Sequence, residues 1–500
     1  MIGRDVRHAG RRAGGAPRQA PAGRSRAASA LRWVPVVLVL AILVGAFASY
    51  RLDLGHRLGL ATPDPATDPA AVAPPEGLAL PPLTAPPAVA RPVGAGTPAV
   101  EPSPARVRAA LAGPLRDRDL GRDVLAAVAG LGTDGTAFAR GSAVGMPAST
   151  TKLLTTTAAL AALGPEHRFR TRVVRAGRHG VVLVGGGDPF LASTPDPGSY
   201  PSVADVTTLA RATAKQLLAD GVRRVRVGYD DTLFTGPAAN PHWPASYLPD
   251  GVVAPIGALW VDEGRAGYGR VADPPRTAAT VFADALARAG VRVSGSPHPR
   301  RAPAGARELA GADSAPLSAI VERTLLVSDN EAAEVLGHQV GLASGGEGSF
   351  AGGVRGVRRE LGRLGVDLTG VRLYDGSGLS RQDRLAPTTL VAVLQAAAST
   401  AHPELRAVVT GLPVAGFTGS LASRFDGATT QGRGRVRAKT GTLTGVTALA
   451  GIATDVDGDP LVFALMADRV RLARTLDARA ALDDAAAALG ACRCARPPAG

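Results

Sequence analysis

Apolar residues recur at regular spacings from about residue 107 to about residue 489, and their period changes along this stretch. Apolar positions three and four residues apart are typical of an amphipathic helix, whereas short apolar runs bounded by turn residues are typical of strands. The helical pattern occurs over 153–163, 206–218, 277–289 and 390–398. Strand-like runs are interspersed with these helices, so the sequence predicts a mixed α and β fold.

The clearest strand signal lies near the C-terminus. Residues 436–453 are predicted to form one strand, and residues 461–466 form another after a short acidic turn. Two strands joined in this way favour an antiparallel hairpin. The turn, 455–460, has the alternating aspartates of a calcium loop, but Pro460 stands where that loop requires glycine. We therefore interpret it as a solvated hairpin turn.

Positive charge is concentrated at the N-terminus. The chain has 500 residues and a formal net charge of +14, and residues 1–32 contain eight arginines against one aspartate, about half of the excess. Because the folded region does not carry a comparable excess, nucleic acid is not a predicted partner.

An uncharged, mostly apolar segment of 18 residues, 33–50, follows this basic region and is just long enough to cross a bilayer. Basic residues ahead of such a segment predict that residues 1–32 are a cytoplasmic tail and that everything after residue 50 is exported. Residues 46–48, Ala-Phe-Ala, also fit a signal-peptidase site. The segment is thus either an uncleaved membrane anchor, which we favour, or a cleaved signal. The cytoplasmic membrane is a predicted partner in the first case.

Both ends of the folded region are flanked by irregular sequence. Residues 51–104 are rich in proline and alanine and are predicted to be an extended linker, and residues 491–500 a tail. The tail holds the only two cysteines, Cys492 and Cys494, whose close spacing predicts that they do not bridge each other. The histidines are scattered, and the glycine-rich stretch 185–189 lacks nucleotide-binding spacing. No metal or cofactor is predicted.

Lysine is rare in this chain. Of 56 lysines and arginines only three are lysines, Lys152, Lys215 and Lys439. An arginine stays charged in a protein, whereas a buried lysine loses its proton readily. A lysine retained against this bias is a candidate for chemistry that arginine cannot perform. Lys215 lies in a predicted helix and is interpreted as a solvated surface charge.

The other two lysines belong to three motifs that occur in a fixed order. Residues 149–152 have the form SxxK, residues 328–330 the form SxN and residues 439–441 the form KTG. Each motif alone is a weak signal. Together and in this order they are typical of β-lactamases and penicillin-binding proteins, which form an acyl-enzyme on the SxxK serine.

The spacing within the first two motifs has a physical reason. Residues three apart on a helix share a face, so the amine of Lys152 is predicted to reach the hydroxyl of Ser149. A desolvated, neutral Lys152 would accept the proton and make Ser149 the nucleophile. Ser328 is predicted to pass a proton to the leaving amine, and Asn330 to bind both the acyl peptide and the lysine.

The third motif is predicted to bind the substrate. Lys439 lies on a predicted strand whose edge can pair with an extended peptide, while Lys439 and Thr440 bind the terminal carboxylate. Gly441 and Thr442 complete the predicted binding residues. The backbone N–H groups of Ser149 and Thr442 are the candidates for an oxyanion hole.

Each motif also has a purely structural interpretation. Ser149 could cap a helix beside a surface lysine, and residues 328–330 could be an N-cap. Lys439 could be a charged residue that prevents an edge strand from pairing with another chain. All three interpretations would have to hold independently. An α/β-hydrolase is disfavoured because the chain has no GxSxG nucleophile elbow.

With these motifs, the chain resembles the penicillin-sensitive D-alanyl-D-alanine carboxypeptidase/endopeptidase family, the class C low-molecular-mass penicillin-binding proteins. The likeness extends over about residues 104–490 and includes five further segments, 183–189, 261–265, 374–380, 412–416 and 437–445. The resemblance implies a transpeptidase-like domain of the α/β (α+β) class, with an antiparallel sheet flanked by helices beside an all-helical half.

The resemblance further implies that residues 105–183 and 297–490 form this catalytic domain and that a smaller domain, 184–296, is inserted between the SxxK and SxN motifs. Only 178 residues separate Ser149 from Ser328. This is shorter than the insertion usual in the family, so we expect one part of it to be missing.

The activity implied is hydrolysis of peptidoglycan stem peptides ending in D-Ala-D-Ala through an acyl-enzyme on Ser149, with β-lactams acylating the same serine. A β-lactamase shares the three motifs, but the long insertion and the lack of a Glu-x-x-Leu-Asn segment make it the weaker alternative. A non-catalytic wall-binding protein that retains the fold is another alternative.

Overall fold

The computed structural model describes residues 101–494 except 134, 142–143 and 268, and all of these belong to one compact unit, 96–500. The predicted tail 1–32, the predicted membrane segment 33–50 and nearly all of the linker 51–104 lie outside the described residues. Within the described part of the chain, none of the helices combines the length and the apolarity that crossing a membrane requires.

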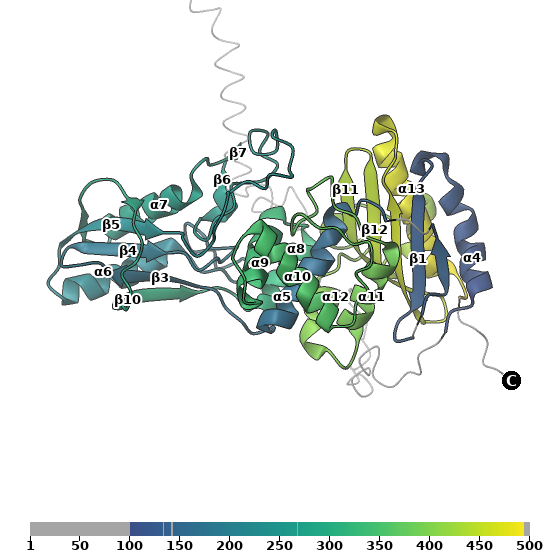
Figure 1. Ribbon diagram of the computed structural model, residues 1–500, viewed down its shortest axis with the longest axis horizontal. Coiled ribbons are helices and arrows are strands. Elements are labelled where there is room, and N and C mark those ends of the chain that lie inside the picture. Colours follow the sequence, from purple (N-terminus) through teal and green to yellow (C-terminus); the bar gives the residue numbers. More distant parts are fainter. Residues whose placement is uncertain (1–100, 134, 142–143, 268, 495–500) are drawn as a thin grey trace, which may run out of the picture. The chain divides into compact units, whose positions relative to one another are not determined.

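The described residues form helices and strands in mixed order (Figure 1). The helices are α4 (Pro104–Ala112), α5 (Thr151–Leu163), α6 (Val206–Ala219), α7 (Pro274–Arg288), α8 (Leu317–Leu326), α9 (Asn330–Ala343), α10 (Phe350–Arg363), α11 (Pro387–Ala398), α12 (Ala407–Thr410) and α13 (Thr475–Ala491). The four helices predicted from the sequence correspond to α5, α6, α7 and α11, with ends within three residues of those predicted.

A five-stranded antiparallel sheet lies at the centre of the part that is predicted to be the catalytic domain. Its strands, in spatial order, are β11 (Val436–Leu443), β12 (Val446–Thr454), β13 (Pro460–Ala467), β1 (Val124–Gly130) and β2 (Phe138–Arg140). Each neighbouring pair is antiparallel. Strand β11 is therefore an edge strand, with one side left without a neighbouring strand of the sheet.

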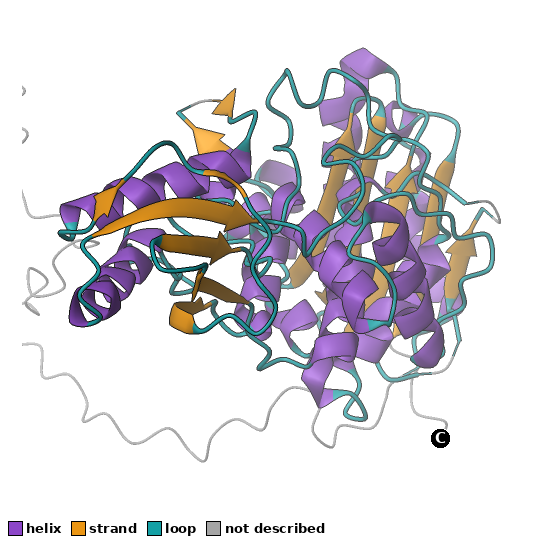
Figure 2. Cartoon of the chain, turned by 60° about the vertical axis from the view of Figure 1, so that its left-hand side comes forward, coloured by secondary structure: helices purple, strands orange, loops and turns teal. Residues whose placement is uncertain are grey.

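Both faces of this sheet are buried. Alternate residues of β1 point to opposite faces, so Leu125 and Ala127 join the core shared with α5, α8, α9, α10 and α11, whereas Val124 and Val128 join the core shared with α4 and α13. The helices therefore cover the sheet on its two sides (Figure 2). This arrangement, with an all-helical half beside an antiparallel sheet, confirms the predicted fold class.

A second sheet belongs to the segment inserted between the first two motifs. Its strands are β10 (Glu308–Asp313), β3 (Arg170–Arg175), β4 (Gly180–Val184), β5 (Arg224–Asp230) and β8 (Arg292–Val293), with β9 (His298–Pro299) also paired to β5. Helices α6 and α7 pack on it through apolar residues such as Leu209 and Phe282. A separate hairpin joins β6 (Arg265–Ala266) to β7 (Gly269–Arg270).

The extent of this sheet differs from the range predicted for the insertion. Strands β3 and β10 pair with each other at one edge, and both lie outside 184–296. These two antiparallel strands are separated by more than 130 residues, so the local sequence pattern could not predict that they pair.

The prediction of one long strand over residues 436–453 is wrong. The structure has two strands there, β11 and β12, which pair in register from Val436 with Ala453 to Leu443 with Val446. The tight turn between them contains Gly445 in the left-handed region, at φ 76°. Because apolar residues lie on both sides of this short turn, the hydrophobic pattern did not indicate a break between the two strands. The hairpin between β12 and β13 is present, and the Asp455 side chain accepts the N–H groups of Asp457 and Asp459 in its turn.

The prediction that the two cysteines do not bridge is also wrong. Cys492 and Cys494 form a disulfide with 5.3 Å between their Cα atoms, a separation that two residues can reach when the chain bends. Cys494 is fully buried, and its N–H donates to Asp455. Its carbonyl accepts the N–H of Ser103. The first residues of the predicted tail and the last residues of the predicted linker are thus part of the folded unit.

Candidate active site

The SxxK motif lies where a short 3-10 turn, Ala148–Thr150, leads into α5. Lys152 is three residues after Ser149, and its Nζ atom lies 3.1 Å from Ser149 Oγ. Ser149 is half-buried, whereas the Lys152 side chain is completely buried. The structure therefore brings the hydroxyl and the amine together as the spacing predicted.

Two further acceptors hold the Lys152 amine. Its Nζ atom donates to Asn330 Oδ1 at 2.7 Å and to the carbonyl oxygen of Ser377 at 2.8 Å. Burial lowers the pKa of Lys152 to about 8, and nearby carboxylates, Glu334 first, oppose this shift. A neutral amine has two hydrogens and one lone pair. With its hydrogens directed at Asn330 and Ser377, its lone pair is left for the proton of Ser149.

The SxN motif occupies the turn between α8 and α9. Ser328 has a left-handed backbone, with φ 61°, and Asn330 is the first residue of α9. Asp329 caps this helix by accepting the N–H of Ala332 at 2.8 Å. The cap fixes the start of α9, so the side chains on either side of Asp329 are presented from a rigid turn.

The KTG motif lies on the edge strand β11 and meets the SxN motif. Lys439 is completely buried, and its Nζ atom donates to Ser328 Oγ at 2.7 Å and to the carbonyl of Thr440 at 2.9 Å. Burial, with the charges of Lys152 and Arg424, lowers the pKa of Lys439 well below its usual value. All three motifs therefore converge on one site, which we call the cleft because a cavity lined by Ser328 and Asn330 adjoins it.

The remaining predicted binding residues follow Lys439 along β11. The hydroxyl of Thr440 lies 3.0 Å from that of Ser420. Gly441 passes so close to the loop before the nucleophile that a Cβ atom there would lie 2.6 Å from the carbonyl oxygen of Pro147. Thr442 is exposed on the same strand. Glycine at 441 thus lets β11 approach the serine loop closely.

Comparison with known proteins identifies the family. The model of the D-Ala-D-Ala carboxypeptidase 3 (S13) family matches residues 107–268 and 265–489 of the chain. The chain belongs to the D-Ala-D-Ala carboxypeptidase 3 (S13) family. It is therefore a serine peptidase, and the predicted resemblance to the penicillin-sensitive D-Ala-D-Ala carboxypeptidases is confirmed.

Individual relatives agree with this assignment. A carboxypeptidase of Mycobacterium tuberculosis is 38% identical over 364 residues, covering 70% of this chain and 76% of the relative. The carboxypeptidase DacB of Mycolicibacterium smegmatis is 36% identical over 397 residues, covering 77% and 84%. The crystal structure of penicillin binding protein 4 from Haemophilus influenzae matches the fold with a TM-score of 0.62 at 20% identity, covering 77% of this chain and 97% of that one.

A buried acidic network beneath the S13 cleft was not found from the sequence. Asp375 accepts the N–H groups of Gly378 at 2.7 Å and Ser380 at 2.6 Å, and the indole N–H of Trp243 at 2.8 Å. Glu334 accepts the N–H groups of the two residues that follow Asp375, as described below. The segment 374–380 stood out as a family signature, but no local pattern indicated that its backbone holds Lys152.

One residue of this segment has to be glycine. Gly378 has φ 82°, and a Cβ atom there would lie 1.9 Å from the carbonyl oxygen of Ala148, directly before the nucleophile. We expect Gly378→Ala to displace the serine loop and lower the rate of acylation by penicillin roughly 100-fold. The measurement is the rate of covalent labelling of the full chain with a fluorescent penicillin.

Gly362→Ala is the matched control, since Gly362 lies on an exposed face of α10 with nothing within 4 Å of the added atom. It should label at the parent rate and unfold at a slightly higher temperature. Parental labelling by Gly378→Ala would contradict the assigned close approach.

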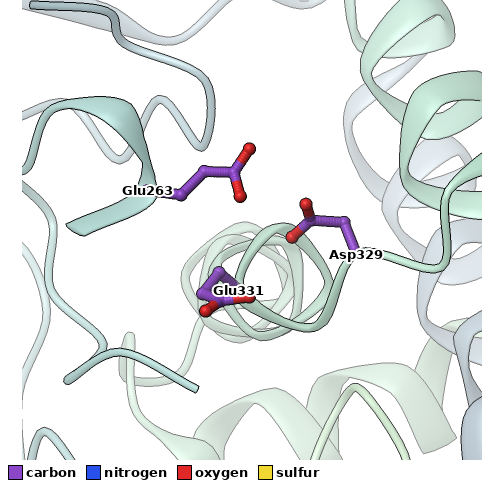
Figure 3. Close-up of side chains that lie close together, drawn as sticks. All are labelled: Glu263, Asp329 and Glu331. Atoms are coloured by element: carbon purple, nitrogen blue, oxygen red, sulfur yellow. The ribbon is translucent and has the colours of Figure 1, made fainter. Parts of the chain in front are cut away.

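A second group of acidic residues lies beside the SxN motif. Glu263, Asp329 and Glu331 direct their carboxylates toward one another, with oxygens within 4.8 Å (Figure 3). Arg265 pairs with Glu263 at 2.7 Å, and Arg270 with Glu331 at 2.6 Å. Burial, together with Asp329, raises the pKa of Glu263 to about 7. A cation would have to compete with the guanidinium groups of Arg265 and Arg270 for these carboxylate oxygens. The cluster also connects the segment 261–265, one of those that carry the family resemblance, to the start of α9.

Proposed function

We propose that this chain hydrolyses the bond between the two D-alanines at the end of a peptidoglycan stem peptide, through an acyl-enzyme on Ser149. The observation that carries the proposal is the fixed direction of the Lys152 amine. When this amine is neutral and donates its two hydrogens to Asn330 and Ser377, its lone pair is left for the hydroxyl of Ser149, whose Oγ lies 3.1 Å away. A buried lysine whose pKa is lowered to about 8 is neutral in roughly one molecule in ten at pH 7, far more often than an exposed lysine.

In the acylation step, Ser149 Oγ attacks the carbonyl carbon of the penultimate D-alanine while Lys152 takes the hydroxyl proton. The backbone N–H groups of Ser149 and Thr442 would stabilise the oxyanion. Collapse of the tetrahedral intermediate breaks the C–N bond, and the leaving amine receives a proton from Ser328, which is reprotonated from Lys439, 2.7 Å away. The proton held by Lys152 then passes through solvent to restore Lys439. In the second step Lys152 takes a proton from the attacking water and returns it to Ser149 Oγ as the ester bond breaks, which frees the serine.

Strand β11 is suited to bind the substrate as an additional strand, because no strand of the described sheet pairs with its outer edge beyond Ala438, where the backbone bonds to residues 413–415 end. The terminal carboxylate would lie against Lys439 and Thr440, with Ser420 beside them. This carboxylate supplies the opposite charge that raises the pKa of the buried Lys439. When the leaving amine belongs to a cross-linking diamino acid, the same steps cleave the cross-link.

β-Lactams fit the same cleft. Penicillin binding protein 4 from Haemophilus influenzae has also been crystallised in complex with a β-lactam. A β-lactam presents a strained amide and a carboxylate to the same groups, but its leaving group stays attached, so the ester on Ser149 is expected to persist.

The site of action follows from the sequence. Residues 33–50 would tether the enzyme to the cytoplasmic membrane, with residues 51–104 as a spacer and the cleft on the outer side, where peptidoglycan lies.

The test is release of D-alanine by the full chain from a synthetic peptide that ends in D-Ala-D-Ala. We expect continuous release that stops when penicillin is added, with one penicillin bound per chain. Absence of release would favour a wall-binding protein, and rapid turnover of penicillin would favour a β-lactamase. A peptide ending in L-Ala-L-Ala is the control and should not be cleaved.

A further inference from the structure

Helix α9 carries a second polar residue one turn beyond Asn330. The side chain of Glu334 is 1% exposed, and each of its two carboxylate oxygens accepts a backbone N–H group. The N–H of Gly376 donates to Oε2 at 3.0 Å, and the N–H of Ser377 donates to Oε1 at 2.8 Å. None of the three sequence motifs includes this residue.

The two N–H groups belong to the loop whose carbonyl binds the catalytic amine. Ser377 donates its N–H to Glu334 and offers its carbonyl oxygen to Lys152 at 2.8 Å. Thr155 steadies the same loop from α5 by donating to the carbonyl of Gly376 at 2.7 Å. Since Asn330 and Glu334 lie four residues apart, one face of α9 holds Lys152 directly through the first and indirectly through the second.

We infer that Glu334 is a positioning residue of this enzyme. It fixes the loop whose Ser377 carbonyl orients the amine of Lys152, and the negative charge of its carboxylate favours the protonated form of this amine. The inference rests on the proposed function, because it takes Lys152 as the base. It concerns a residue that does not touch the substrate.

Several charged groups surround the Lys152 amine. Burial lowers its pKa, and the carboxylates that oppose the shift are Glu334, then Asp375, Asp329 and Glu331. Lys439 is the nearby positive group: burial, then repulsion by the charges of Lys152 and Arg424, lowers the pKa of Lys439.

The nearer surroundings of Glu334 also titrate. Burial, then the charge of Asp375, raises the pKa of Glu334 to about 8, although the N–H groups of Ser377 and Gly376 favour its ionised form. Burial and Asp375 raise the pKa of Asp383 well above its usual value, and burial lowers that of His338 to about 4. Near neutral pH Asp383 and His338 are therefore uncharged. Glu334 titrates in the same range as Lys152, so it carries its negative charge in only part of the molecules there.

Glu334→Gln separates this role from a purely structural one. The amide keeps one acceptor oxygen but turns an NH2 group toward the second N–H donor, so the loop loses one hydrogen bond and the Ser377 carbonyl shifts. We expect the maximal rate of acylation by fluorescent penicillin to fall between about 10- and 100-fold. Loss of the negative charge also lowers the pKa of Lys152, so Lys152 is neutral at lower pH. The acidic limb of the pH–rate profile should therefore move to lower pH, by at most about one pH unit, because Glu334 is only partly ionised in this range.

Glu334→Asp provides the conservative comparison. It retains the charge but is one methylene too short to reach both N–H groups, so the maximal rate should fall while the acidic limb stays in place. Glu360→Gln is the matched control. Glu360 lies on α10, and its buried carboxylate accepts hydrogen bonds from Ser344 and Arg363. Its profile should equal that of the parent chain.

The outcomes separate the inference from the proposed function. If the parent chain is not acylated at any pH, the proposed function fails. If it is acylated but Glu334→Gln keeps the parent limb and rate, the inference is overturned. Thermal unfolding of each variant shows whether it folds. If Glu334→Gln does not fold, the aspartate variant decides, and a parental rate for it would overturn the inference.

Discussion

Replacing Ser149 by alanine abolishes covalent labelling of the full chain by fluorescent penicillin, with a fall in acylation rate of roughly a million-fold. The variant removes the oxygen that forms the ester, and no other hydroxyl is positioned in its place. Ser328, the other hydroxyl at a lysine of the cleft, is bound to Lys439 and not to Lys152. Labelled bands on a gel, with the mass of the intact adduct, provide the measurement.

The control for this variant is Ser318→Ala, which removes a half-buried hydroxyl from α8 outside the cleft. It should label like the parent chain. Undiminished labelling of Ser149→Ala would rule out Ser149 as the acylated residue, and with it the proposed mechanism.

Replacing Lys152 by arginine is expected to lower the acylation rate at least about 1000-fold. A guanidinium keeps its proton in a protein, so it cannot accept the proton of Ser149. Its planar head is also too large for a buried space fitted to one amine and three acceptors. The rate of penicillin labelling, followed over minutes to hours, measures the effect.

Lys215→Arg is the matched control, since Lys215 is exposed on α6. Equal rates for the two variants would show that Lys152 acts only as a positive charge. A rate for Lys152→Arg within a few-fold of the parent would exclude it as the base.

The contacts among the candidate catalytic groups could be predicted because the proposed chemistry restricts the residue types and their local spacing. Lys152 lies three residues after Ser149, so their contact depends only on the short 3-10 turn and the first turn of α5. The rarity of lysine drew attention to Lys439 as well. What the sequence could not show is how the loop at Ser377 reaches Lys152 across 225 residues, or that Glu334 supports it. These contacts exist only after the helices have packed.

Parts of the fold were missed for related reasons. Helices α5, α6, α7 and α11 have continuous patterns and were predicted closely. Strands β3 and β10 pair across the whole insertion, so their shared sheet has no local signal. The Cys492–Cys494 disulfide depends on a bend that follows α13, where Cys494 packs against the β12–β13 turn. In each case the missing information was tertiary contact and not residue preference.

Helix α9 belongs to both parts of the molecule. Its Asn330 and Glu334 serve the cleft, whereas Glu331 pairs with Arg270, and Gln339 donates to the carbonyl of Gly186. The last two partners lie in the insertion. A shortened enzyme without the insertion would leave a carboxylate and an amide unpaired inside the helix that supports the base. The insertion therefore supports the helix that carries Asn330 and Glu334, and its removal is expected to disturb the cleft.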